Sequence, residues 1–304
     1  MGAPLAEFCH HDLRLVGSSL AGEETFIVAP ELNLAFDMGR AQREILGVDH
    51  VFLTHGHMDH AAGIAYYFSQ RMFIDNQPGY LYAPVSLVEP IQRLLRVWED
   101  IDGHEPPAHV QAAEPGKDIP LRRNLIVRPF AVNHPCRRQD RAVVPALGYT
   151  AIEIRQKLIS EYQNLTGPQL VELKKQGVQI TRQVEIPLVT YCGDTAAGDF
   201  LDLDHVRNSR VLLLECTFVE PEHRERARAG NHIHIDDLRS IVPRLNNERI
   251  VLIHLSRRTS LSVARNLLQR ELGAEQSARI SFFMEHRRGK RRFLPRDDAS
   301  GDDA

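Results

Sequence analysis

THGHMDH, residues 54–60, holds three histidines and one aspartate, and the rest of the predicted structure is arranged around it. Apolar runs flank it at 51–53 and 61–68, and this pattern predicts a buried strand, a turn and then a helix. Alternate side chains of an extended segment share one face, so His55 and His57 can converge on one cation. The sequence therefore predicts a metal site at the carboxyl end of a strand.

Asp59 and His60 lie beyond the predicted turn and can face a second cation nearby. Ligands that combine imidazole with carboxylate and lack thiolate favour zinc, with manganese or iron as competitors, over calcium or magnesium. A solvated polar loop, or a helix capped by Asp59, is the structural alternative, but neither needs so many histidines so close together. We therefore expect two divalent metal ions, with zinc as the first choice.

The composition indicates an ordinary globular protein. The chain has 304 residues, of which 43% are hydrophobic and 25% charged, so it can bury a full-sized core. The net charge of −3 does not indicate a general nucleic-acid binder, although it is compatible with a local basic face. The cysteines have no close pair spacing, and neither a secretion signal nor a membrane span is recognisable, so we expect a cytoplasmic protein.

Strands and helices alternate along the chain. We expect strands near 13–16, 25–28, 32–37, 51–53, 125–132, 186–191, 210–214 and 249–253, and helices at 85–98, 236–245 and 262–272. Two short helices are predicted within a small insertion around 156–177. The sequence thus predicts one α/β domain, 1–292, in which two sheets pack between helices in four layers, followed by a disordered acidic tail at 293–304.

Three isolated residues follow predicted apolar strands: His134, Asp194 and His254. Taken alone, each is more often a satisfied core histidine or a turn aspartate. Taken with the first cluster, they complete two ligand sets, because each catalytic cation needs at least three protein ligands and an open position for water. A carboxylate can reach two cations with its two oxygens, so Asp194 is the natural bridge.

His-x-His-x-Asp-His, present here at 55–60, resembles the signature of the metallo-β-lactamase superfamily. Four further segments look like motifs of the tRNase Z (ribonuclease Z) family and follow in its order: 36–43, 192–195, 214–218 and 254–258. The likeness spans roughly 13–258. It implies the metallo-β-lactamase fold, a four-layer αββα sandwich, and a homodimer.

The resemblance also implies residue roles. His55, His57 and His134 would hold the first metal, and Asp59, His60 and His254 the second, with Asp194 bridging them. Asp59 would orient the attacking water, and Glu215 with His232 would form the acid pair for the leaving group. His234 is expected to contact substrate or to replace His232 as proton donor; the alternative for both histidines is a cap or surface role before the next helix.

Substrate contacts are expected at Arg137 and Arg138, which closely follow His134 and could attract an anion. Bacterial family members carry a long flexible arm that docks the tRNA. Here residues 165–177 are similar to a stretch beside that arm, but no glycine-rich basic arm is recognisable in the sequence.

The sequence therefore predicts a dinuclear metal-dependent hydrolase of phosphodiesters, of the ribonuclease Z type, acting on tRNA, another RNA or a small diester. One alternative is a thioester, lactone or glyoxalase-type hydrolase on the same metal centre. The other is a metal-binding protein without catalytic activity. The combination of Glu215, His232-x-His234 and the segment 254–257, which resembles the nuclease branch, disfavours the first alternative. A full ligand set with a bridging aspartate and a proton donor disfavours the second.

Overall fold

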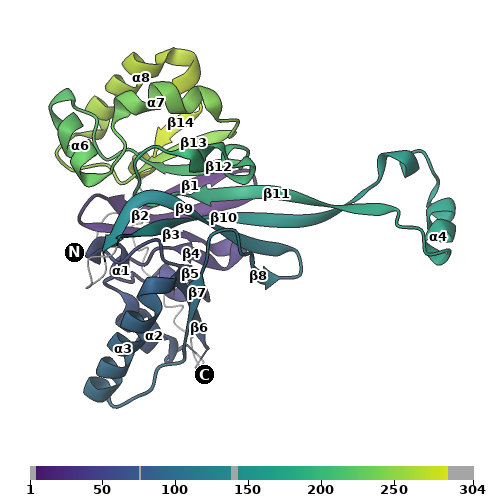
Figure 1. Cartoon of the computed structure of the whole chain (residues 1–304), viewed down its shortest axis with the longest axis horizontal. Helices are drawn as coiled ribbons and strands as arrows, with labels where there is room; N and C mark the ends of the chain where they lie inside the picture. Colours follow the sequence, from purple (N-terminus) through teal and green to yellow (C-terminus); the bar gives the residue numbers. More distant parts are fainter. Residues whose placement is uncertain (1–4, 75–76, 138–142, 287–304) are drawn as a thin grey trace, which may run out of the picture.

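Two seven-stranded β-sheets pack face to face in the computed structural model, which describes residues 5–74, 77–137 and 143–286. Helices cover the outer face of each sheet, so the layers run helix, sheet, sheet, helix (Figure 1). The predicted four-layer αββα sandwich is confirmed. The covering helices are α2 (Ile64–Arg71) and α3 (Val85–Asp102) on the first sheet, and α6 (Arg224–Gly230), α7 (Leu238–Ile241) and α8 (Leu261–Ser277) on the second.

The first sheet contains its strands in chain order, β1 to β7. The first three pairings are antiparallel and the next three are parallel. The carboxyl ends of the parallel strands therefore meet at one edge, where ligand sites of such sheets gather. The strands are β1 (Ala6–His10), β2 (Leu13–Leu20), β3 (Glu24–Ala29), β4 (Leu34–Phe36), β5 (His50–Phe52), β6 (Gly79–Pro84) and β7 (Ala108–Ala113).

The second sheet repeats this plan in the order β14-β13-β12-β11-β10-β9-β8. Its first three pairings along the chain are again antiparallel and its last three parallel. The two halves thus share one topology, which no repeat in the sequence had indicated. The strands are β8 (Ile119–Arg122), β9 (Leu125–Arg137), β10 (Val143–Leu158), β11 (Thr181–Tyr191), β12 (Val211–Glu215), β13 (Arg249–Ile253) and β14 (Ile280–Phe282).

The core between the sheets is rich in aromatic rings. Phe52 on β5 stacks on Tyr82 at a centroid distance of 4.7 Å, and Phe36 stacks on Tyr191 of the opposite sheet at 5.1 Å. The neighbours of Phe52, Val51 and Leu53, point the other way, into the core beneath α2 and α3. A strand buried on both faces needs a continuous apolar run, which explains the sequence before the histidine motif.

Strands β10 and β11 continue beyond the sheet as a two-stranded arm (Figure 1). The short helix α4 (Gly167–Lys175) lies at its tip. Gln169 stabilises the start of that helix, because its Oε1 accepts a hydrogen bond from the backbone N–H of the N-cap residue Thr166 at 2.8 Å. Two expectations need correction. Residues 156–158 belong to β10 and not to a helix, because they pair with 181–183. An arm is also present, built as a β-ribbon without a glycine-rich loop.

Other differences are local. The predicted helix at 236–245 is divided into a 3₁₀ turn (Ile235–Asp237), α7 and a second 3₁₀ turn (Val242–Arg244), the last of which contains a proline near its start. The expected acidic tail at 293–304 lies outside the described residues. None of the helices in the described part of the chain is long and apolar enough to cross a lipid bilayer.

Candidate metal centre

The histidine motif connects β5 to the short helix α1 (Met58–Ala61). His55 and His57 lie before the helix, and Asp59 and His60 lie in its only turn. Backbone bonds fix that turn, because the N–H groups of Met38 and the next residue both donate to the carbonyl of His60, at 2.8 and 3.0 Å. The side chains of the motif therefore project from a rigid edge of the first sheet.

The first group of candidate ligands faces one point. His55 Nε2 lies 2.9 Å from His57 Nδ1, which lies 3.5 Å from Nε2 of His134, a residue of β9. Asp194, which follows β11, places Oδ2 3.8 Å from His55 Nε2. These four ligand atoms all lie within 4.8 Å of one another.

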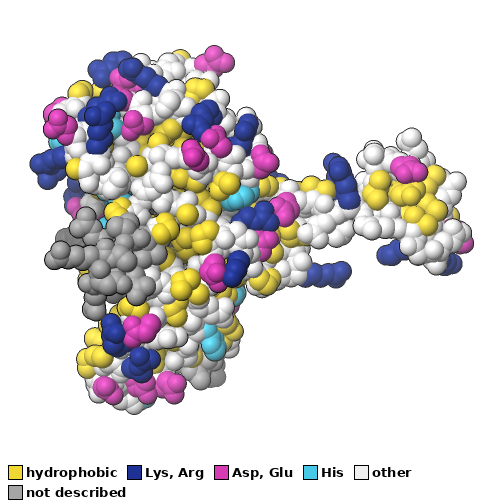
Figure 2. Space-filling model, viewed as in Figure 1, with side chains coloured by type: hydrophobic (Ala, Val, Ile, Leu, Met, Phe, Trp, Pro, Cys, Tyr) yellow, Lys and Arg dark blue, Asp and Glu magenta, His cyan; other side chains and the backbone are white. Residues whose placement is uncertain are grey.

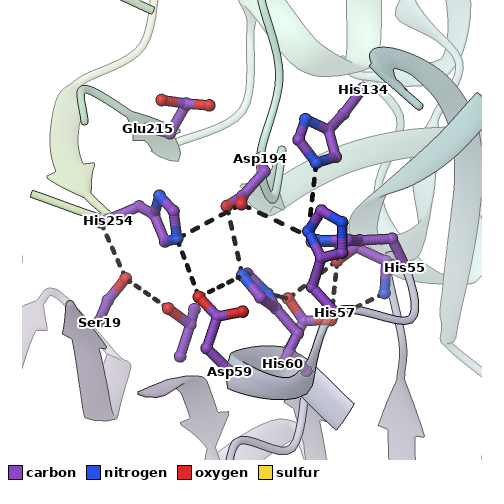
Figure 3. Close-up of polar contacts among 12 residues, drawn as sticks. Ser19, His55, His57, Asp59, His60, His134, Asp194, Glu215 and His254 are labelled. Carbon is purple, nitrogen blue, oxygen red and sulfur yellow. Dashed lines mark hydrogen bonds and ion pairs between the residues drawn. The ribbon is translucent and has the colours of Figure 1, made fainter. Parts of the chain in front are cut away.

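The second group adjoins the first. His254, which follows β13, places Nε2 3.4 Å from Asp59 Oδ2, and His60 Nε2 lies 3.6 Å from the same oxygen. Asp194 also reaches this group, with Oδ1 3.4 Å from His60 Nε2 and Oδ2 3.3 Å from His254 Nε2. Figure 3 shows Asp194 between the two groups. The structure thus brings all seven predicted ligands together, with Asp194 shared.

The donor set fits divalent cations. Ligand atoms about 2.0–2.2 Å from a tetrahedral ion lie roughly 3.3–3.6 Å apart, which is close to most of these separations. In addition, His60 Nε2 and Asp194 Oδ1 are buried and have no hydrogen-bond partner among the described residues. Buried polar atoms are normally satisfied, so such a pair facing each other points to a cation between them.

Two site residues adopt the left-handed backbone conformation, Asp37 with φ 53° and His254 with φ 58°. This conformation costs of order 1–3 kcal/mol for a residue other than glycine, so the surroundings have to hold it. Asp37 N–H donates to the Phe52 carbonyl at 2.9 Å, and His254 N–H donates to Ser19 Oγ at 2.9 Å. Both bonds come from the first sheet, which aims the two side chains at the centre.

Glu215 and His232 form a second buried unit beside the ligands. Glu215, at the end of β12, accepts a hydrogen bond from His232 Nδ1 at 2.8 Å and another from the Thr195 N–H at 2.7 Å. The His232 ring stacks on His254 at a centroid distance of 5.5 Å. The predicted acid pair is therefore in contact with the ligand cluster.

Comparisons with known proteins agree with this geometry. The sequence model of the family described as "Metallo-beta-lactamase superfamily" matches residues 20–73. Two tRNase Z proteins of Arabidopsis thaliana are similar to the chain: the chloroplastic TRZ2, 30% identical over 87% of this chain and 73% of its own length, and TRZ1, 31% identical over 80% and 85%. The chain belongs to the tRNase Z (ribonuclease Z) family.

Solved structures agree on the fold. The short form of human tRNase Z has a TM-score of 0.57 at 16% identity, covering 92% of this chain and 96% of that one. YhfI from Bacillus subtilis has a TM-score of 0.60 at 14% identity, with the same coverage. The expectation of a metal-dependent hydrolase related to ribonuclease Z is confirmed by the family. The two groups above are the candidate ligands of its dinuclear metal site.

His234 does not join the centre of this tRNase Z relative. It is buried, its Nε2 donates to the Glu220 carbonyl at 3.0 Å, and its Nδ1 accepts from the Asp236 N–H at 3.3 Å. Nδ1 thus caps the following turn and Nε2 is bonded to the upstream Glu220 carbonyl, so neither ring nitrogen is left for a substrate or a proton transfer. The cap alternative is therefore the one that the structure favours. Arg138 and the side chain of Arg137 lie outside the described residues.

Of the groups behind the ligands, the sequence offered only Asp37, which fits a carboxylate that supports the ligands and a turn aspartate equally well. Asp37 accepts from His60 Nδ1 at 2.7 Å, from the Thr54 N–H at 2.8 Å and from the Tyr191 hydroxyl at 2.6 Å. His134 Nδ1 faces the Asn231 carbonyl at 3.5 Å. The only signal available was the position of Asp37 at the end of an apolar run, which a turn aspartate would share.

The electrostatics of the site favour a bound cation. Burial lowers the pKa of His60, but the carboxylates of Asp194 and Asp37 outweigh burial and hold that pKa well above its usual value. Burial, reinforced by the nearby charge of His60, lowers the pKa of His55 well below the usual range. The pocket thus stabilises positive charge at His60 and keeps His55 neutral, the form in which an imidazole binds a metal.

Glu215 also controls the protonation of His232. Burial lowers the pKa of His232, but the Glu215 carboxylate outweighs burial and raises the pKa to about 9. In Glu215→Gln, burial remains and the charge is lost, so we expect the His232 pKa to fall below its ordinary value. Titration of the metal-free protein followed by NMR measures this change. The pKa of His205, about 4 and set mainly by burial, should not change; an unchanged His232 pKa would contradict the pairing.

Proposed function

We propose that this chain is a two-metal endoribonuclease that cleaves a phosphodiester bond in RNA, with the 3′ trailer of a precursor tRNA as its substrate. One observation carries the proposal. Two ligand groups share Asp194, and they contact a buried carboxylate–imidazole pair, Glu215 with His232. The first supplies the place for a nucleophile, and the second supplies a proton for the leaving group.

The metal ligands are proposed to be His55, His57 and His134 for one ion and Asp59, His60 and His254 for the other, with Asp194 shared. Zinc is the proposed metal, because the donors are imidazoles and carboxylates at tetrahedral spacing. When bound, two such ions would lower the pKa of a water molecule to about 7 and stabilise charge on the phosphoryl oxygens.

Asp59 is proposed to orient the nucleophilic water. Its Oδ2 is fixed by the Gly22 N–H at 2.9 Å and lies near His254. Burial raises the pKa of Asp59, but His254 and His60 outweigh it and lower the pKa to about 2. The side chain is therefore a carboxylate at neutral pH and accepts a hydrogen bond from the attacking water.

His232 is proposed to donate the proton to the departing ribose oxygen. A pKa of about 9 means that its imidazole is protonated at neutral pH. Glu215 holds Nδ1 at 2.8 Å, which leaves Nε2 as the nitrogen that can face the substrate. The carboxylate thus both orients the ring and stabilises its charge, as in other acid pairs.

Two cavities beside His134 give room for nucleotides on either side of the reacting phosphate. One of about 460 Å³ is lined by Asn133 and Ala196, the other of about 450 Å³ by His57 and Leu87. The arm is proposed to dock the more distant part of the RNA. It carries Lys and Arg side chains (Figure 2), including Arg155, Lys157, Lys174, Lys175 and Arg182.

We also propose a cytoplasmic homodimer. All four cysteines are free thiols, as suits a reducing compartment. Helix α3 has an exposed apolar stripe at helical spacing, Leu94, Val97, Trp98 and Ile101, which a second copy could cover. Light scattering of the purified protein measures the assembly.

Removing the shared ligand should cost both metals. We expect Asp194→Ala to reduce bound zinc from about two equivalents per chain toward none, since its carboxylate contacts both ligand groups. His134→Ala should mainly affect one ion. Elemental analysis measures both, with the exposed Asp199→Ala as the matched control. Two retained equivalents in Asp194→Ala would refute the shared role.

The rate lost on removing a general acid depends on how strongly the leaving group needs a proton. On precursor tRNA with a 3′ trailer, Glu215→Gln and His232→Ala should each lower kcat roughly 10²- to 10⁴-fold. On bis(p-nitrophenyl) phosphate, whose leaving group departs unaided, both should stay near wild type when assayed at saturating zinc. His234→Ala is the control and should show no dependence on the leaving group. Equal losses on both substrates would exclude a proton transfer by this pair.

The arm can be removed without touching the centre. Arg155 and Val184 are paired across the ribbon, so an Asn-Gly turn joining them should close a shortened hairpin. We expect KM for precursor tRNA to rise at least about tenfold, the scale of a few lost phosphate contacts, while bis(p-nitrophenyl) phosphate hydrolysis stays unchanged. Lys174→Glu with Lys175→Glu should give a smaller rise that shrinks with added salt. An unchanged KM for RNA would exclude the docking role.

A further inference from the structure

We infer that Thr54 and Thr217 are positioning residues, each of which fixes the tautomer of one metal-facing histidine. Thr54 acts on His55 and Thr217 acts on His254. The inference rests on the proposed metal centre and concerns the side of each imidazole that faces away from it. In both cases a threonine hydroxyl lies between a buried carboxylate and the Nδ1 atom of the histidine.

Thr54 makes this contact in the first sheet. Its hydroxyl lies 2.9 and 3.0 Å from the two oxygens of Asp37 and 2.9 Å from His55 Nδ1. A carboxylate only accepts hydrogen bonds, so the single hydroxyl proton goes to Asp37. The hydroxyl oxygen must then accept from His55, and Nδ1 carries the ring proton. His55 Nε2 is left with its lone pair, directed at His57 and Asp194.

Thr217 repeats the arrangement in the second sheet. Its hydroxyl lies 2.6 Å from Glu215 Oε2 and 2.9 Å from His254 Nδ1. The hydroxyl proton again belongs to the carboxylate, so His254 donates from Nδ1 and presents the bare Nε2 to Asp59 and Asp194. A neutral histidine without this bond could place its proton on Nε2, where it blocks coordination.

Each carboxylate therefore orients two imidazoles, one directly and one through a hydroxyl. Asp37 bonds His60 directly and His55 through Thr54, while Glu215 bonds His232 directly and His254 through Thr217. Both threonines and both relayed histidines are buried, at most 3% exposed, so bulk water cannot replace the hydroxyl. Thr217 thereby links a metal ligand to the same carboxylate that holds the proposed proton donor.

The test compares isosteric with conservative substitutions. Thr→Val at 54 or 217 keeps the shape and removes the hydroxyl, whereas Thr→Ser keeps the hydroxyl. A metal ligand that loses the hydrogen-bond partner of its other ring nitrogen typically binds its metal 10- to 100-fold more weakly. Each Val variant should therefore bind zinc more weakly by about that factor. The zinc affinity of each Ser variant should stay within about threefold of wild type, a smaller change than the 10- to 100-fold loss. Zinc affinity is measured by competition with a chelator.

A second readout reports the tautomer itself. In the zinc-loaded wild type, NMR should show slowly exchanging Nδ1–H protons for His55 and His254, and each Val variant should lose the one at its own site. Thr150→Val is the matched control, because Thr150 is also buried and its hydroxyl lies 2.9 Å from a histidine Nδ1, that of His205, outside the centre. It should change neither zinc affinity nor these protons.

The outcomes separate this inference from the proposed function. A wild type that binds no zinc overturns the metal centre itself. A wild type that binds zinc, with Val variants that bind as tightly and keep their Nδ1–H signals, overturns the relay alone. Ser variants as weak as the Val variants also overturn it, because packing and not the hydroxyl would then matter. If a Val variant does not fold, Thr→Ala at that position replaces it in the same comparison.

Discussion

The buried negative charge of Asp194 is the constraint on which the rest of the centre depends. A carboxylate that is 2% exposed loses nearly all contact with water, which is costly unless positive charge or donors surround it. Burial raises the pKa of Asp194, but His254 and His60 outweigh it and hold the pKa well below its usual value. The charge therefore persists in the core only because histidines from both sheets reach it.

The packing of the two sheets sets this arrangement. Asp194 comes from the second sheet, whereas His55 and His60 come from the first, so a small slide of one sheet would separate them. The Tyr191 hydroxyl on Asp37, at 2.6 Å, and the stacking of Tyr191 on Phe36 oppose such a slide, because each joins the two sheets next to the centre. The aromatic core thus does two things: it stabilises the fold and it fixes the spacing of the ligands.

The arm relates to the centre in a different way. Strands β10 and β11 leave the sheet together, and β11 is the strand that ends just before Asp194. One continuous strand therefore connects the projecting arm to a candidate metal ligand. In the first half of the molecule the corresponding strands β3 and β4 are joined by a single 3₁₀ turn (Pro30–Leu32). The same topology thus carries a short connection in one half and a long projecting one in the other.

The sequence by itself determined the kinds of candidate ligand, their order and their place at strand ends. The THGHMDH stretch could be read because strand and helix periodicities are local, and because few structural roles need such a cluster. His134, Asp194 and His254 could be added because each follows an apolar run. It was thus predictable which residues would gather at the site, and so was the four-layer fold.

Only the tertiary structure decided which atoms meet. It placed His232 on Glu215 and turned His234, two positions away, into a cap, a distinction that the spacing could not make. It brought Tyr191 to Asp37 across 154 positions and revealed the hydroxyls of Thr54 and Thr217 behind the histidines. It also extended β10 through residues that local pattern assigned to a helix. The physical reason is that hydrogen-bond partners and strand pairing depend on segments distant in the sequence. Sequence periodicity indicates only which face of one segment is apolar.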